Sequence, residues 1–183
     1  MRLSLSIAFA LAVLLSSCNM DPKKEESPAY FDVKTVENRL KNHLEKVQPA
    51  VEQYVAIGQK VEKVKIEGPS VNWENQFKLL DDIDLNKPVL EGLYKVDSLG
   101  QSLRYELLNE DTKASVISLE VQDRDGMNSL VAYLRGETLV HKANRKISLK
   151  WKDDQLISYE VHGLTKVVMQ DTVTYTVEIK PLW

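Results

Sequence analysis

Close to its C-terminus the chain reads Thr172-Val173-Thr174-Tyr175-Thr176-Val177-Glu178-Ile179-Lys180, in which polar and apolar residues alternate without a break. In a β-strand, successive side chains point to opposite faces, so this pattern gives one apolar face and one polar face. The segment is therefore expected to form a half-buried strand, with a hydrophobic core on one side and water on the other.

The same period of two recurs upstream, between about residues 93 and 179. Three further apolar sets follow it: Leu103, Tyr105 and Leu107; Ile117, Leu119 and Val121; Ile147, Leu149 and Trp151. Turn-forming residues separate the alternating runs: Asn109 to Thr112, Asp125-Gly126, Arg135-Gly136, Lys152-Asp153-Asp154, His162-Gly163 and Gln170-Asp171. Such short links can join only antiparallel strands, so residues 91–183 are expected to form an antiparallel meander of about six to eight strands.

The region before this meander shows a helical pattern instead. Asp32 is suited to cap a helix N-terminus, and apolar or weakly polar residues follow it with a seven-residue repeat. The members of this stripe are Val33, Val36, Leu40, His43, Val47, Ala50, Tyr54, Ile57 and Val61. Pro49 removes one backbone donor, so the prediction is a long helix kinked at Pro49, or a closely aligned pair of helices. Leu44, Val51 and Val55 widen the stripe, which favours packing on a sheet or another helix over a free coiled coil.

A second helix is expected to begin near Ser70 or Asn72 and to end before Pro88. Its apolar residues are spaced at four, three and three, and they are Trp73, Phe77, Leu80 and Ile83. Between the two helical segments, Val64 and Ile66 alternate with charged residues and predict a short strand closed by Gly68-Pro69.

These patterns predict an α+β fold with a single domain over residues 31–183. Residues 31–90 are expected to be mainly helical and residues 91–183 mainly strands. Because each half has one apolar face, the helices are expected to cover the sheet, which is twisted or curved into a half-barrel.

The charge pattern excludes one class of function. The 183 residues include 24 Lys and Arg against 27 Asp and Glu, for a formal charge of -3, and both signs are spread along the chain. Nucleic-acid binding needs clustered cations, so no nucleic-acid partner is predicted.

The N-terminus has the layout of a secretory signal, with Met1-Arg2 followed by an apolar segment. The unbroken apolar run from Ile7 to Leu15 is about nine residues, far short of the roughly 20 that span a bilayer as a helix. The following Leu15-Ser16-Ser17-Cys18 resembles the lipobox of bacterial lipoproteins. An ordinary signal peptide with small residues before its cleavage site is the alternative.

The resemblance to bacterial lipoproteins implies that residues 1–17 are a signal peptide removed by signal peptidase II. Cys18 would then carry a diacylglycerol on its sulfur and an acyl chain such as palmitate on its amine. The expected location is the cell envelope, with the outer membrane favoured and the periplasmic or surface face left open. Two or three acyl chains hold a protein on a membrane almost permanently, so no transmembrane helix is required.

Residues 18–30 are expected to form the lipidated end and a disordered tether. Asn19 to Ala29 is polar and is interrupted by Pro22 and Pro28. A coil of about ten residues has an end-to-end distance near 15–20 Å, which keeps the domain close to the membrane. Lys23-Lys24 has three acidic neighbours, so a solvated linker is favoured over a lipid-binding segment.

No metal site or cofactor is predicted. Cys18 is the only cysteine, and its lipidation leaves no thiol for a disulfide, a nucleophile or zinc. Asp123 to Asn128 resembles part of a calcium loop, but aligning Gly126 puts Val121 and Ala132 at ligand positions, which favours a hairpin turn. The histidines His43, His141 and His162 lack the spacing of zinc ligands; His43 is expected to be partly buried and His162 to lie in a turn.

No catalytic residue is predicted either. Paired carboxylates can hydrolyse glycosides beside a tryptophan, and the carboxylates to consider are Glu74, Asp81, Asp82 and Asp84. Nothing in their spacing selects a pair, and the sequence has no phosphate-binding loop or nucleophile elbow. The three tryptophans could line a binding concavity, although the phase of Trp151 with Leu149 favours a core position; they are Trp73, Trp151 and Trp183.

The sequence therefore predicts a membrane-tethered envelope lipoprotein with a non-catalytic domain that binds a partner protein or an apolar ligand. Helix-covered curved antiparallel sheets occur in lipoprotein carriers and receptors, and the expected architecture is similar to theirs. Two alternatives stay open: a structural or assembly subunit without a ligand pocket, and a hydrolase that uses carboxylates.

Overall fold

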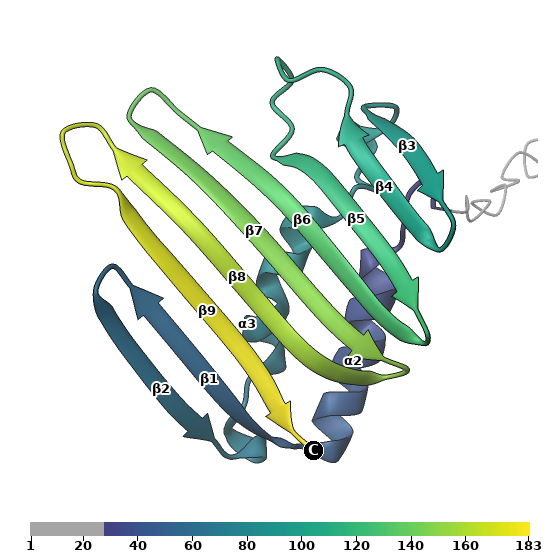
Figure 1. Cartoon of the computed structure of the whole chain (residues 1–183), viewed down its shortest axis with the longest axis vertical. Coiled ribbons are helices and arrows are strands. Elements are labelled where there is room, and N and C mark those ends of the chain that lie inside the picture. Colours follow the sequence, from purple (N-terminus) through teal and green to yellow (C-terminus); the bar gives the residue numbers. More distant parts are fainter. Residues whose placement is uncertain (1–27) are drawn as a thin grey trace, which may run out of the picture.

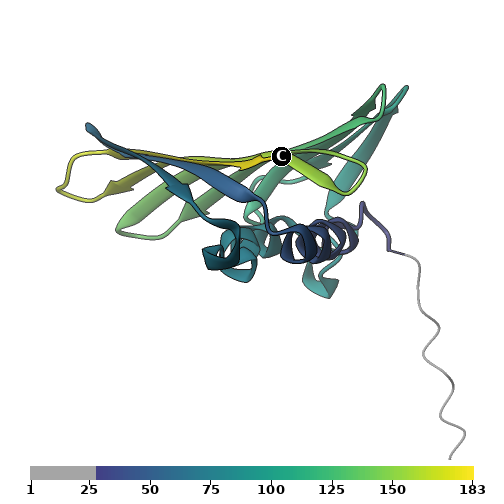
Figure 2. The same ribbon diagram turned by 90° about the horizontal axis from the view of Figure 1, so that it is seen from below.

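The computed structural model describes residues 28–183, which form one open antiparallel sheet with helices on one face (Figures 1 and 2). The nine strands lie in the order β2-β1-β9-β8-β7-β6-β5-β4-β3. Their bounds are β1 (Ala50–Ile57), β2 (Lys60–Ile66), β3 (Tyr94–Leu99), β4 (Ser102–Leu107), β5 (Val116–Arg124), β6 (Met127–Glu137), β7 (His141–Lys152), β8 (Gln155–Val167) and β9 (Val173–Leu182). The antiparallel meander is thus confirmed, as a twisted open sheet and not a closed barrel.

Short helices account for the rest of the regular structure. They are α2 (Val33–Val47), η2 (Gly68–Ser70), α3 (Trp73–Phe77), η3 (Lys78–Ile83) and η4 (Pro88–Leu90). Figure 2 shows α2 and α3 under the same face of the sheet. Within residues 28–183, no helix has the length and apolar character that crossing a membrane would need.

The long helix predicted from residue 33 to residue 61 is wrong beyond Val47. The carboxylate of Asp32 caps α2 by accepting from the Thr35 backbone N–H at 2.9 Å, as expected. Gln48 then adopts a left-handed conformation with φ 50°, which ends the helix. Residues 50–66 form the β1–β2 hairpin instead, so the helical segments of residues 31–90 are interrupted by two strands.

Pairing with β9 explains why residues 50–57 form a strand and not a helix. In its extended conformation β1 pairs with β9, with Val55 opposite Val177. The C-terminal strand β9 therefore has a hydrogen-bonded neighbour on each side, β1 and β8. This pairing satisfies backbone groups that a helix would have bonded internally. Val51 and Val55, four residues apart, share a helix face and a strand face equally well, so the stripe could not distinguish the two structures.

The second helical segment lies where the pattern placed it. The side chain of Asn72 caps α3 by accepting from the Asn75 backbone N–H at 2.9 Å. The chain is α-helical to Phe77 and continues as the tighter η3 helix to Ile83. All four apolar residues of this segment are buried, with exposures of 0–3%.

Two of the predicted turns are wrong. Arg135-Gly136 lies inside β6, and His162-Gly163 lies inside β8. Gly163 makes room for Tyr175 on β9, because a Cβ at this position would overlap the ring of that tyrosine unless the ring moved. The turns at Asp125-Gly126 and Asp153-Asp154 are confirmed as hairpin ends.

We call the helix-covered side of the sheet the inner face, and it carries the core. Its largest fully buried side chains come from both layers and are Leu40, Leu44, Phe77, Leu80, Ile83, Leu119, Leu130, Ile147, Leu149, Trp151 and Tyr159. The ring of Phe77 on α3 meets that of Tyr159 on β8 edge to face, with centroids 5.8 Å apart. Side chains therefore fill the space between helices and sheet.

The other side, the open face, has no helix over it (Figure 2). One row across strands β4 to β9 shows its character: it reads Arg104, Glu120, Val131, Ser148, Glu160 and Glu178. A polar row of this kind is what solvent contact requires of a one-sided sheet.

Candidate functional site

The acidic residues considered for catalysis do not form a pair. The ammonium of Lys41 binds Glu74 at 2.6 Å, and the guanidinium of Arg145 binds Asp82 at 3.0 Å. Asp81 forms an ion pair with Lys34, and Asp84 accepts from the Asn86 backbone N–H at 3.0 Å. Each carboxylate thus has its own partner on α2, β7 or its own loop.

The tryptophans do not line a common concavity. Trp73 and Trp151 are buried in the core, with exposures of 3% and 2%. Trp183 is half exposed; its indole Nε1 donates to the Leu156 carbonyl at 2.9 Å, and its ring lies 5.7 Å from that of His43. Trp183 therefore closes the end of the core against α2.

The histidines are equally dispersed. His43 is partly buried on α2, as expected, and His141 lies at the start of β7. His162 lies in the middle of β8 on the open face, so its assignment to a turn is wrong. Among residues 28–183, no group of three or more His, Cys, Asp or Glu side chains is arranged to hold a metal ion.

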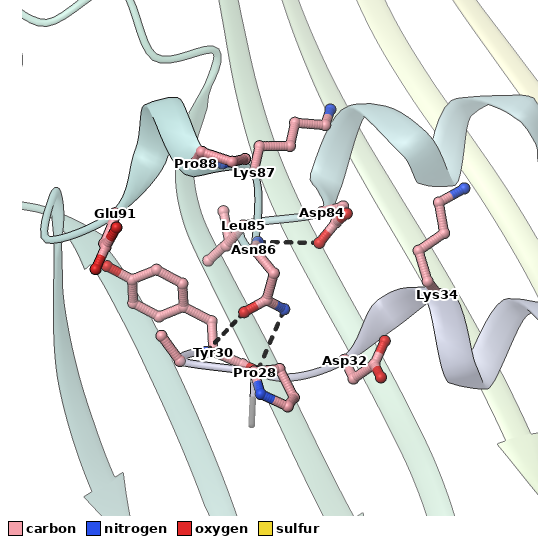
Figure 3. Close-up of a pocket in the computed structure, with 11 residues that line it drawn as sticks. Pro28, Tyr30, Asp32, Lys34, Asp84, Leu85, Asn86, Lys87, Pro88 and Glu91 are labelled. Carbon is pink, nitrogen blue, oxygen red and sulfur yellow. Dashed lines mark hydrogen bonds between the residues drawn. The ribbon is translucent and has the colours of Figure 1, made fainter. Parts of the chain in front are cut away.

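A first cleft lies where the described chain enters the domain (Figure 3). Its volume is about 580 Å³ and its walls come from residues 28–34 and 84–91. The amide of Asn86 accepts from the Tyr30 backbone N–H at 2.9 Å and donates to the carbonyls of Tyr30 and Phe31 at 3.3 and 3.2 Å. Asn86 thereby fixes the backbone of Tyr30 and Phe31 through hydrogen bonds, as the backbone of a paired strand would.

Two tyrosines complete this attachment. The Tyr30 hydroxyl accepts from the Gly92 backbone N–H at 3.0 Å, and the Tyr105 hydroxyl accepts from that of Phe31 at 3.1 Å. The Tyr30 ring meets the rings of Tyr94 and Tyr105 edge to face. The contacts of Asn86, Tyr30 and Tyr105 therefore fix the N-terminal segment, and we assign the cleft a structural role.

The second cleft is a hollow on the open face, and we call it the sheet hollow. It spans strands β5 to β9, has a volume of about 560 Å³ and opens to solvent. Its principal side chains are Ile117, Tyr133, Lys146, His162, Leu164 and Thr176. Register places them side by side: Tyr133 opposes Lys146, which opposes His162, which opposes Thr176.

The sheet hollow combines apolar and polar contacts. Tyr133 is 48% exposed and Leu164 is 38% exposed, and both lie on the open face outside the core. The Lys146 ammonium lies 5.8 Å from the centre of the Tyr133 ring, within reach of a cation–π contact. The Nδ1 atom of His162 lies 3.0 Å from the Thr176 hydroxyl, and its Nε2 atom lies 3.6 Å from a Glu160 carboxylate oxygen.

This arrangement can hold a ligand that has an apolar part and an anionic group. Tyr133 and Leu164 offer apolar surface, Lys146 offers a positive charge, and the Thr176 hydroxyl offers a hydrogen-bond partner. Sequence reasoning missed this site because its residues come from five strands. The available signal was the position of Tyr133 and Leu164 on the polar phase of β6 and β8.

No protein-family model, curated protein or solved structure matches the chain, so its functional interpretation rests on the residues and geometry described above.

Proposed function

We propose that this chain is a membrane-anchored lipoprotein of the bacterial cell envelope. Its non-catalytic domain binds a partner protein or an apolar ligand on the open face of the sheet. The observation that carries the binding proposal is the sheet hollow, where the exposed side chains of Tyr133 and Leu164 lie near Lys146. We place the protein at the outer membrane, facing either the periplasm or the cell surface.

The anchoring part rests on the resemblance of Leu15-Ser16-Ser17-Cys18 to a lipobox. Cys18 and the proposed signal peptide lie outside the described residues. The described chain is already held at Tyr30, which is 8% exposed, so about ten residues separate the proposed lipid from the folded domain. A link of this length keeps the domain beside the membrane.

The packing supports surface binding over carriage of a ligand inside the domain. Trp151, Tyr159 and Phe77 fill the space between helices and sheet, where a carrier would need room for an acyl chain. The filled core also favours the second candidate function, a structural or assembly subunit that docks through its surface. The two candidates differ in whether a small ligand or a protein occupies the sheet hollow.

A photo-crosslinking residue at Leu164 of the full-length chain tests the binding proposal in producing cells. We expect an adduct of defined mass at position 164, and loss of that adduct when Tyr133 and Lys146 are both replaced by alanine. The matched control is the same crosslinker at Arg104, an exposed position on β4 of the open face.

The mass of the adduct distinguishes the two candidates. A lipid or other small molecule favours the ligand-binding domain, whereas a protein favours the docking subunit. Equal labelling at positions 164 and 104, or an adduct that survives the double alanine substitution, would contradict a specific role for the sheet hollow.

A further inference from the structure

Two hairpins end in exposed apolar residues that the core does not use. Leu139 and Val140 lie between β6 and β7, while Val168 and Met169 lie between β8 and β9; we call these four residues the tip patch. Leu139 and Met169 are each 100% exposed, and Val140 and Val168 are 60% and 58% exposed. The Val168 backbone N–H donates to the Val140 carbonyl at 3.0 Å, and Figure 1 shows the two hairpins ending side by side.

The opposite end of the same strands has a different chemistry. The β5–β6 hairpin turns at Asp125-Gly126, and the β7–β8 hairpin turns at Asp153-Asp154. A scattered exposed leucine needs no explanation, but adjacent exposed apolar residues on two tips mark a contact surface. Those two turns are polar, and the neighbouring β3–β4 turn exposes one leucine, Leu99, so among the described hairpins the tip patch is where two apolar tips adjoin.

A pair of lysines lies directly behind the tip patch. Lys142 on β7 and Lys166 on β8 are exposed and stand opposite each other in the register. Like charges in this position destabilise a sheet unless an anion lies between or beside them. Lys142 binds Glu137 at 2.6 Å, whereas Lys166 forms no ion pair within the described part of the chain. The lysine pair can therefore bind a further anionic group.

The spacing between apolar tips and lysines matches a lipid surface. Lys142 follows Leu139 by three residues, which corresponds to about 10 Å along a strand. Apolar side chains that bind at a bilayer surface enter by about 5–10 Å, while lysine ammonium groups stay at the head groups. The tip patch also lacks aromatic residues and arginine, the residue types that dominate protein-binding hot spots.

The start of the folded domain is connected to this end of the sheet through β3 and β5. The Tyr30 ring packs on Tyr94, the first residue of β3, and the Tyr94 hydroxyl donates to the carbonyl of Val116, the first residue of β5. Val116 in turn pairs with Leu134, three residues before the end of β6. In Figure 1 the β6–β7 tip lies at the upper left and the start of the described chain at the right. A chain of about ten residues spans at most about 35 Å, so a lipid on Cys18 keeps the membrane within that distance of Tyr30, and an extended chain would let the tip patch meet the same membrane.

From this geometry we infer that the tip patch inserts into the surface of the bilayer that holds the lipid on Cys18, with Lys142 and Lys166 on the phosphates of anionic lipids. The inference rests on the proposed lipid anchor. Asn144 and Leu164 of the sheet hollow lie two residues from these lysines along their strands. Insertion would therefore bring the sheet hollow close to the membrane surface.

Fluorescence of the full-length lipidated protein in vesicles tests the insertion. Leu139→Cys would be labelled with a polarity-sensitive dye; the Cys18 sulfur, as a thioether, does not react. In phosphatidylcholine vesicles with phosphatidylglycerol, we expect a blue shift of the dye emission and loss of its intensity when the lipids carry brominated acyl chains. The matched control, Asp125→Cys at the opposite end, should show neither change. Replacing Lys142 and Lys166 by glutamate should abolish the dependence of the blue shift on phosphatidylglycerol.

Each other outcome has a defined meaning. A protein that floats with the vesicles while the dye at position 139 stays in water would overturn insertion and leave the anchor intact. A blue shift that needs an added envelope protein would assign the tip patch to a protein partner and overturn insertion too. A protein that does not float and has an unmodified Cys18 would overturn the anchor, and the insertion with it.

Discussion

The two faces of the sheet have the same strands but opposite chemistry. On the inner face, Leu149 and Tyr159 face each other in the register and are 1–2% exposed under the helices. One position along, on the open face, Ser148 pairs with Glu160 and no helix lies over them, although neighbouring side chains leave Ser148 only 8% exposed. The inner face provides burial and therefore stability, because buried apolar area is the main favourable term in folding.

In a one-sided sheet, the two faces are expected to serve different purposes. Under the helices, side chains from both layers fill the inner face. On the open face, Tyr133 and Leu164 are exposed apolar side chains that the core does not use. We therefore expect substitutions on the inner face to lower stability and substitutions on the open face to alter binding.

The largest effect is expected for Phe77→Ala, which removes a fully buried ring between α3 and β8. Losing a buried phenylalanine costs about 3–5 kcal/mol in the free energy of unfolding, through lost burial and the cavity left behind. Denaturant unfolding followed by circular dichroism measures it. Tyr133→Ala on the open face is the control; an equal loss there would break the distinction between the faces.

The second-largest effect is expected at alkaline pH, where ionisation of tyrosines buried on the inner face should lower the free energy of unfolding. Burial raises the pKa of Tyr94 to about 12, whereas an exposed phenol has a pKa of about 10. The unfolded chain therefore loses its proton first, so stability is full below about pH 10 and falls by about 2–3 kcal/mol as pH rises to about 12.

Denaturant midpoints measured between pH 9 and pH 12 would show this fall. Burial also raises the pKa of Tyr159, which steepens it. In Tyr94→Phe the fall should be smaller, and stability at pH 8 should drop by about 1 kcal/mol because the hydrogen bond to the Val116 carbonyl is lost. An unchanged pH profile in Tyr94→Phe would show that Tyr94 ionises equally in both states.

Gly163→Ala should lower stability by about 1 kcal/mol, the low end of overpacking, because the new Cβ meets only the Tyr175 ring, which can turn aside. The matched control is Gly136→Ala in β6, where the nearest atom lies 4.0 Å from a new Cβ. Thermal melts of both variants measure how much stability depends on the space that Gly163 leaves for Tyr175. If Tyr175→Ala fails to restore the stability of Gly163→Ala, contact with that ring is not the cause.

The smallest stability change is expected for Lys146→Ala on the open face, within about 1 kcal/mol, because it loses only an exposed contact with the Tyr133 ring. The same substitution should weaken labelling from the crosslinker at Leu164. A large loss of stability with unchanged labelling would show that Lys146 contributes to folding and not to binding, contrary to the role we assign to the open face.

The sequence predicted the strands of the meander well, since the alternation in β9 and β7 is imposed by burial on one side only. It failed at β1 because Val51 and Val55 fit both a helix and a strand, and only pairing with β9 decides between them. It failed at Gly163 because that glycine makes room for Tyr175, twelve residues away, and not for a turn. The sheet hollow was beyond reach because side-by-side placement of Tyr133, Lys146 and His162 depends on register.

The proposed function depends on the lipid anchor at Cys18. The intact mass of the protein from the membrane fraction tests whether that anchor exists. We predict a chain that begins at Cys18 and carries the added mass of a diacylglycerol and an acyl group, absent in Cys18→Ser. A membrane-associated chain with another N-terminus, or with an unmodified Cys18 thiol, would contradict the account.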